Sequence, residues 1–196
     1  MCIRDSTNAV AKLALKYTHQ AAEVLGEEPD SDWLHVAENI PILEFKDGVT
    51  RENATYDGVT IKQADVNLLA HPLNYYTDEN QINKDLDYYA PKYDLNGPAM
   101  GFCILSTLYS WQGKMDKAYD FFERSFRPNE VPPFGVISET RNGNNPYFIT
   151  GAGGALQAAM FGFGGLKITD EGVIETEQKL PKEWNSMEVK GYFKKQ

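Results

Sequence analysis

The hydrophobic positions along the chain follow helical spacing in most segments. In the first of them, apolar residues recur every three or four positions between lysines and glutamates, at Val10, Leu13, Ala14, Tyr17, Ala21 and Val24. Gly26 follows as a helix stop. Similar amphipathic stripes occur in three later segments. We therefore predict helices with one buried face over residues 7–25, 30–40, 78–89 and 115–126.

Three other segments have no polar face. Residues 99–111 and 150–163 are apolar nearly all round, and a third predicted helix runs from Ile61 to Pro72. Fully buried helices that alternate with half-buried ones are typical of an αα-hairpin array with an inner and an outer ring. A helical repeat protein is the alternative, but no period of about 34 residues is visible. The pattern predicts a mainly α fold that forms half of a helical barrel.

The two ends of the chain differ from this helical region. Residues 165–174 have the pattern of a strand, a turn and a strand, and residues 187–193 alternate like a further strand. We therefore predict a helical domain over 7–164 and the beginning of a β domain over 165–196. Residues 1–6 have no periodicity, and we interpret them as a non-native or artefactual tail outside the fold.

Composition narrows the function classes. The net charge of −9 and the pI of about 4.8 argue against a nucleic-acid partner. No apolar run is long enough for a membrane span. The three histidines have no metal-ligand spacing, Cys2 and Cys103 make no disulfide framework, and no dinucleotide motif follows a strand. We predict neither a cofactor nor a metal, and the compartment stays open.

The first candidate for chemistry is the segment Thr55–Leu69. It places Lys62, Gln63 and Asp65 at the start of an otherwise apolar predicted helix. Polar groups at such a position are either paired with each other or face a wet cavity. A structural pair between Lys62 and Asp65 at i,i+3 spacing is the simpler interpretation.

The second candidate is the polar loop 127–148, which is longer than ordinary connections and contains Glu139 directly after Val136-Ile137-Ser138. A loop that joins inner helices crosses the mouth of a barrel, where such folds keep their sites. Glu139 as an ordinary solvated residue is the alternative. Under that alternative the chain is a non-catalytic helical binding module.

Several motifs at these two segments and between them resemble those of glycoside hydrolase family 65. They are Ile61-Lys-Gln-Ala-Asp-Val66, Gly97-Pro-Ala-Met100, Pro133-Phe-Gly135 with Ser138-Glu139, Thr150-Gly-Ala-Gly-Gly-Ala-Leu-Gln157 and Gly162-Phe-Gly-Gly-Leu166. The family contains disaccharide phosphorylases for maltose, trehalose and kojibiose, and also hydrolases similar to acid trehalases and glucosylgalactosyl-hydroxylysine glucosidases. The resemblance implies an (α/α)6 barrel of the six-hairpin glycosidase type, followed by a β-sheet domain.

The resemblance also implies roles for single residues. The Lys62-Gln63 pair matches the family's glucose-binding subsite, so both side chains are expected to contact sugar hydroxyls. Phosphorylases carry Ser-Ile-His at the position of Ile137-Ser138-Glu139, and hydrolases carry a glutamate. Glu139 therefore favours hydrolysis of an α-glucoside, with a phosphorylase as the alternative.

An inverting hydrolase needs a general acid and a general base on opposite sides of the scissile bond. Glu139 fits the base, because a carboxylate there repels phosphate and activates water. In the family the acid lies about ten residues before a Tyr-Thr-Asn, of which only Thr7-Asn8 matches. We therefore expect the acid upstream of Met1 and the chain to be a C-terminal fragment that lacks the N-terminal half of its barrel and is inactive alone.

Overall fold

The computed structural model describes residues 4–141, 143, 145–169 and 171–191. This part of the chain is mainly helical, with two small antiparallel sheets, and divides into two compact units. Unit 1 comprises the residues up to Val59 together with Asp65–Pro91, and unit 2 comprises Thr60–Ala64 together with the residues from Lys92 onward. The domain division at residue 164, which the sequence suggests, stays a prediction.

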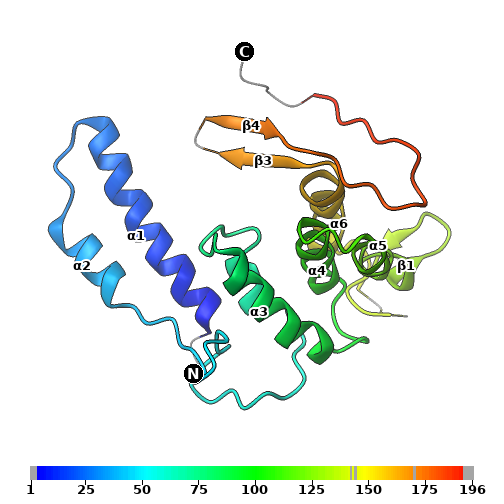
Figure 1. The fold of residues 1–196 in the computed structure, drawn as a ribbon, viewed down its shortest axis with the longest axis horizontal. Helices are drawn as coiled ribbons and strands as arrows, with labels where there is room; N and C mark the ends of the chain where they lie inside the picture. The colour runs from blue at the N-terminus through cyan, green and yellow to red at the C-terminus, as the bar shows by residue number, and fades with distance from the viewer. Residues whose placement is uncertain (1–3, 142, 144, 170, 192–196) are drawn as a thin grey trace. The chain divides into compact units, whose positions relative to one another are not determined.

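The α-helices of unit 1 lie close to their predicted ranges, and a short 3-10 helix stands where a longer helix was predicted. They are α1 (Asp5–Leu25), α2 (Ser31–Asn39), the 3-10 helix η1 (Val66–Leu69) and α3 (Glu79–Tyr89). Gly26 ends α1 with a φ of 73°, a left-handed conformation that glycine adopts without strain. Asp30 and Asp78 begin α2 and α3, because their carboxylates accept hydrogen bonds from backbone N–H groups of the first turn. Figure 1 shows α1 and α2 side by side.

The start of α1 corrects the interpretation of residues 4–6 as a tail outside the fold. Asp5 is fully buried; its N–H donates to the Glu52 carbonyl (3.0 Å) and its Oδ2 accepts from the Leu43 N–H (3.0 Å). The predicted apolar stripe of α1 is also wrong as a buried face, since Val10 is 49% and Val24 is 87% exposed. Residues 1–3 lie outside the described residues.

The predicted helix from Ile61 to Pro72 is wrong. Residues 60–64 are not helical: Ile61 forms a parallel bridge with Tyr93, in which its N–H and C=O bond to backbone groups of Lys92 and Asp94. Only η1 follows. Because the Ile61 carbonyl accepts from the Asp94 N–H in this bridge, it does not serve as the first acceptor of a helix that starts at Ile61. Lys62 and Gln63 are exposed, which also corrects the expectation of a helix buried on all sides.

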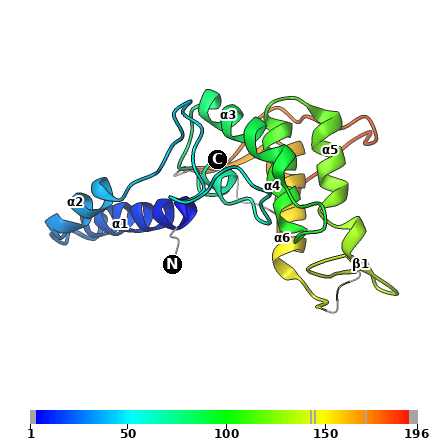
Figure 2. The ribbon, with the colours of Figure 1, turned by 90° about the horizontal axis from the view of Figure 1, so that it is seen from below.

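Unit 2 is built around a helix that has no polar face. The short 3-10 helix η2 (Ala90–Lys92) crosses from unit 1 into unit 2. The helical elements that follow are α4 (Met100–Trp111), α5 (Met115–Arg124), η3 (Arg127–Asn129), α6 (Ile149–Gln157) and the π-helix η4 (Ala158–Phe163). Every residue of α4 from Gly101 to Ser110 is buried, as the sequence predicts. Figure 2 shows α4 packed against α5 and α6. Gly162 permits close packing, because a Cβ there would lie 3.3 Å from the Thr107 Cα.

Two short hairpins complete unit 2. Strand β3 (Leu166–Thr169) pairs with β4 (Gly172–Glu175) in antiparallel register, which confirms the predicted strand–turn–strand segment. The further strand predicted at 187–193 does not form over 187–191, and its last residues lie outside the described part of the chain. The second hairpin joins β1 (Glu130–Val131) to β2 (Val136–Ile137) inside the predicted loop 127–148.

Candidate functional site

Glu139 lies two residues after β2, and a buried asparagine fixes its backbone. The Asn129 side chain is 3% exposed, and its Nδ2 donates to the carbonyls of Ser138 (3.1 Å) and Glu139 (3.0 Å). The Asn129 carbonyl accepts from the Ser138 N–H (2.8 Å), so the two segments are joined in both directions. Because these groups are buried and paired, the β1–β2 hairpin holds residues 138–139 at a defined position.

The Glu139 side chain is half-exposed and has one polar contact among the described residues. Asn145 Nδ2 donates to Glu139 Oε2 (3.0 Å), while the Glu139 N–H donates to the Asn145 carbonyl (3.2 Å). The first of these is a hydrogen bond between an amide and a carboxylate. Glu139 is therefore neither buried in the core nor without support. A carboxylate in this position can reach a water molecule or a ligand.

Lys62 and Gln63 lie in unit 2, the unit that contains Glu139. Their segment adjoins the residues that precede α4: a Cβ on Gly97 would lie 3.4 Å from the Lys62 carbonyl oxygen. Two residues later, the Ala99 N–H donates to the Glu139 carbonyl (3.4 Å). Residues 97–99 thus lie beside the Lys62 backbone and are hydrogen-bonded to the Glu139 backbone.

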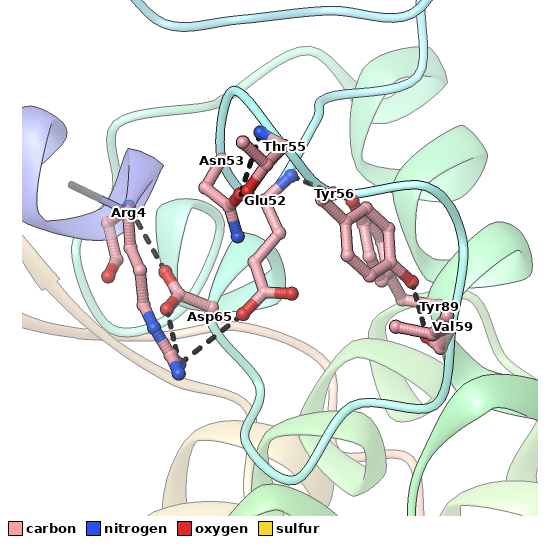
Figure 3. Close-up of polar contacts among 9 residues, drawn as sticks. Arg4, Glu52, Asn53, Thr55, Tyr56, Val59, Asp65 and Tyr89 are labelled. Atoms are coloured by element: carbon pink, nitrogen blue, oxygen red, sulfur yellow. Dashed lines mark hydrogen bonds and ion pairs between the residues drawn. The ribbon is translucent and has the colours of Figure 1, made fainter. Parts of the chain in front are cut away.

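Asp65 belongs to unit 1 and has a different environment (Figure 3). It is 3% exposed, its Oδ2 pairs with Arg4 Nη1 (2.9 Å), and its Oδ1 accepts from the Ser6 N–H (3.2 Å). Arg4 also pairs with Glu52 at 3.4 Å. The hydrogen bond to Asp65 raises the pKa of Arg4, whereas burial raises the pKa of Glu52. Asp65 therefore has a structural role that ties the start of α1 to the segment before η1.

A buried tyrosine extends this network. Tyr89, fully buried on α3, donates its hydroxyl proton to the Thr50 carbonyl (2.7 Å) and accepts from the Glu52 N–H (3.1 Å). Thr50 in turn donates to both oxygens of Asp85, from its N–H and its hydroxyl, at 2.8 Å each. Burial raises the pKa of Asp85. The loop 42–58 is therefore held by side chains of α3.

Among the described residues, no three His, Cys, Asp or Glu side chains gather as a metal would require. None of the described helices is both long and apolar enough to cross a bilayer.

Three residues near these sites were missed by the sequence analysis. Asn129 and Asn145 both contact Glu139, and Tyr89 joins two segments of unit 1. Asn145 belongs to a conspicuous Asn-rich run, which signals a polar loop without showing what it binds. Asn129 and Tyr89 have no local signal, because their partners lie 10 and 39 residues away in the sequence.

Comparison with known proteins finds one family match and several similar hydrolases. Residues 49–129 match the model of the glycosyl hydrolase family 65 central catalytic domain. A kojibiose hydrolase from Mucilaginibacter mallensis is 52% identical over 94% of this chain, and an acid trehalase from Emericella nidulans is 36% identical over 85%. The chain spans 28% and 17% of these relatives, respectively.

A solved structure shows the same fold. A kojibiose phosphorylase from the human microbiome superposes with a TM-score of 0.70 over 93% of this chain and 30% of its own, at 19% sequence identity. At this identity the likeness concerns the fold. The family match and the similar hydrolases confirm the resemblance predicted from the sequence: residues 49–129 match the central catalytic domain of glycoside hydrolase family 65, and the chain is similar to named glycoside hydrolases over most of its length.

Proposed function

We propose that this chain is part of an inverting α-glucoside hydrolase in which Glu139 is the general base and Lys62 and Gln63 bind the glucosyl residue. The names of the similar proteins support hydrolysis of an α-glucosyl disaccharide such as kojibiose or trehalose. The remainder of the (α/α)6 barrel, including its N-terminal half, belongs to the longer protein in this proposal. The helices of unit 2 correspond to part of that barrel.

One observation carries the proposal. The short segment 97–99 lies beside the Lys62 carbonyl at Gly97, and its Ala99 N–H donates a hydrogen bond to the Glu139 carbonyl. Two polar positions that are far apart in sequence thus adjoin the same segment before α4. Both side chains are at least partly exposed, as groups that bind a sugar and a water molecule need to be.

The proposed reaction uses two carboxyl groups. Glu139 takes a proton from water while the water oxygen attacks the anomeric carbon from the face opposite the leaving group. The bond from that carbon to the leaving oxygen breaks, and a carboxylic acid protonates this oxygen. The product is β-glucose. Lys62 supplies a fixed positive charge and Gln63 an amide that both donates and accepts, which suits the hydroxyls of a sugar.

The general acid comes from the longer protein in this proposal. We therefore expect the 196-residue chain alone to release no glucose from kojibiose or trehalose. Turnover by the isolated chain would show that one of its own carboxyl groups serves as the acid, and the assignment of roles would then be wrong.

Substitution of Glu139 in the full-length enzyme tests the base. Glu139→Gln is expected to lower kcat by a factor of about 10² to 10⁴, because amides do not accept a proton from water. Glu139→Ala leaves a space, and added azide, which needs no base, is expected to restore turnover and yield β-glucosyl azide. Retention of activity in both variants would rule out Glu139 as the base and favour the binding module.

The same assays separate hydrolysis from phosphorolysis. A hydrolase releases glucose at a rate independent of phosphate, and NMR shows the β-anomer first. A phosphorylase instead requires phosphate and yields glucose 1-phosphate. Phosphate-dependent release of that product by the full-length enzyme would replace the hydrolase proposal with its alternative.

A further inference from the structure

We propose that Asn145 is a positioning residue that orients the Glu139 carboxylate for proton transfer. The inference rests on the proposed function, because it assumes that Glu139 is the general base. It assigns a role in the reaction to a residue that touches neither the sugar nor the water.

The contacts between the two residues form a closed pair. Asn145 donates from its side chain to Glu139 Oε2 (3.0 Å) and accepts from the Glu139 N–H at its backbone carbonyl (3.2 Å). Asn145 therefore holds the base at both the side chain and the backbone. Next to this pair, the Thr140 carbonyl accepts hydrogen bonds from the Gly143 N–H (3.0 Å) and from the Ser138 hydroxyl.

The choice of oxygen has a chemical consequence. Oε2 is occupied by the Asn145 amide, whereas no hydrogen bond to Oε1 occurs within the part of the chain that the structure describes. A carboxylate with one oxygen fixed presents the other in a restricted set of directions. Oε1 is then the atom that receives the proton, and the amide stabilises the charged carboxylate before the transfer.

Asn129 provides the contrast that makes the inference testable. It contacts only the backbone around Glu139 and is almost fully buried, so its loss removes the donor to the Ser138 carbonyl in a buried position. Asn145 is exposed, and its replacement leaves no buried group unpaired. Substitution at Asn129 should therefore lower stability, whereas substitution at Asn145 should change the reaction alone.

The experiment uses the full-length enzyme. Asn145→Ala is expected to lower kcat by about tenfold to a hundredfold, with KM within about twofold and an unchanged Tm, since the lost bond acts on the base and not on sugar binding. Asn145→Asp is expected to lower kcat further and to move the acidic limb of the kcat–pH profile to higher pH, because a second carboxylate favours protonation of the first. Asn96→Ala, an exposed asparagine of the same unit, is the control.

A double substitution separates this inference from the proposed function. In a Glu139→Ala background, where azide replaces the base, Asn145→Ala should cause no further loss, since there is no carboxylate left to orient. If Glu139→Gln is fully active, the proposed function fails. If Glu139→Gln is inactive while Asn145→Ala equals the wild type, only the inference fails. An additive loss, or a joint fall in kcat and Tm, would assign Asn145 a structural role and overturn it.

Discussion

Two carboxylates, Asp65 and Glu139, stand in the two polar segments that the sequence marks as candidate sites. Asp65 is 3% exposed, pairs with the Arg4 guanidinium and accepts a hydrogen bond from a backbone N–H. Glu139 is partly exposed and accepts one hydrogen bond from a side-chain amide. A buried carboxylate whose two oxygens are both paired is costly to disturb and is shielded from ligands by its burial. A supported carboxylate with an open oxygen can take part in chemistry. The comparison therefore shows a structural role for the first region and supports the proposed reactivity of the second.

The largest effect on stability is expected at Tyr89. Tyr89→Phe removes the hydroxyl that bridges the Thr50 carbonyl and the Glu52 N–H, and leaves two backbone groups unpaired in the core. We expect the free energy of unfolding to fall by about 1–3 kcal/mol, measured by urea denaturation of the chain. Tyr17→Phe, at an exposed position on α1, should change it by less than about 0.5 kcal/mol.

The full-length enzyme sharpens the same prediction. Tyr89→Phe should leave kcat/KM unchanged at temperatures well below its Tm, because it touches neither Lys62 nor Glu139. A large loss of activity without a loss of stability would contradict the division of roles between Asp65's region and Glu139's region.

The sequence predictions succeeded where the signal is local and failed where the structure depends on a distant partner. Helices with local signals were predicted well: Asp30 and Asp78 begin theirs, and Gly26 ends α1. The helix from Ile61 failed, because the bridge to Tyr93 depends on a partner 32 positions away that no local pattern reveals. Local capping is encoded in neighbouring residues, whereas a bridge is encoded in tertiary context.

The candidate site shows the same limit. Its chemistry was suggested by residue types and by resemblance to a family, which single out Lys62, Gln63 and Glu139. The support around Glu139 could not be predicted, since Asn129 and Asn145 are ordinary loop residues in the sequence. The apolar stripe of α1 is a further case. Its spacing is typical of a buried face, but Val10, Tyr17 and Val24 are exposed in the described part of the chain.

A smaller loss of stability is expected at Asp65 itself. Asp65→Asn keeps an oxygen for the Ser6 N–H but loses the charge that pairs with Arg4, whose side chain is 45% exposed. We expect a loss of about 0.5–1.5 kcal/mol that shrinks at high salt. Asp120→Asn breaks an exposed pair with Arg124 and should cost about 0–0.5 kcal/mol. Equal losses in the two variants would show that burial adds nothing to the Asp65 pair.

An effect of a different kind concerns His71, and it is confined to acidic pH. Burial lowers the pKa of His71 from 6.5 to about 4, so between these values the unfolded chain binds more protons than the folded one. Stability from His71 is therefore present above pH 6.5 and is lost as the pH falls toward 4. The difference in unfolding free energy between wild type and His71→Gln should be constant above pH 6.5 and decline below it.

Asp5 provides the opposite sign and so a check on the His71 measurement. Burial raises the pKa of Asp5 from 3.8 to about 7, so in this interval the folded chain binds more protons and stability falls as the pH rises. The unfolding free energy of the wild type, relative to that of Asp5→Asn, should accordingly fall as the pH rises from 4 to 7. Relative to that of His71→Gln, it should rise over the same interval. Slopes of the same sign in both comparisons would mean that one of these side chains is solvated in the folded chain. The pH profile of unit 1 would then come from other groups, such as the buried Asp85.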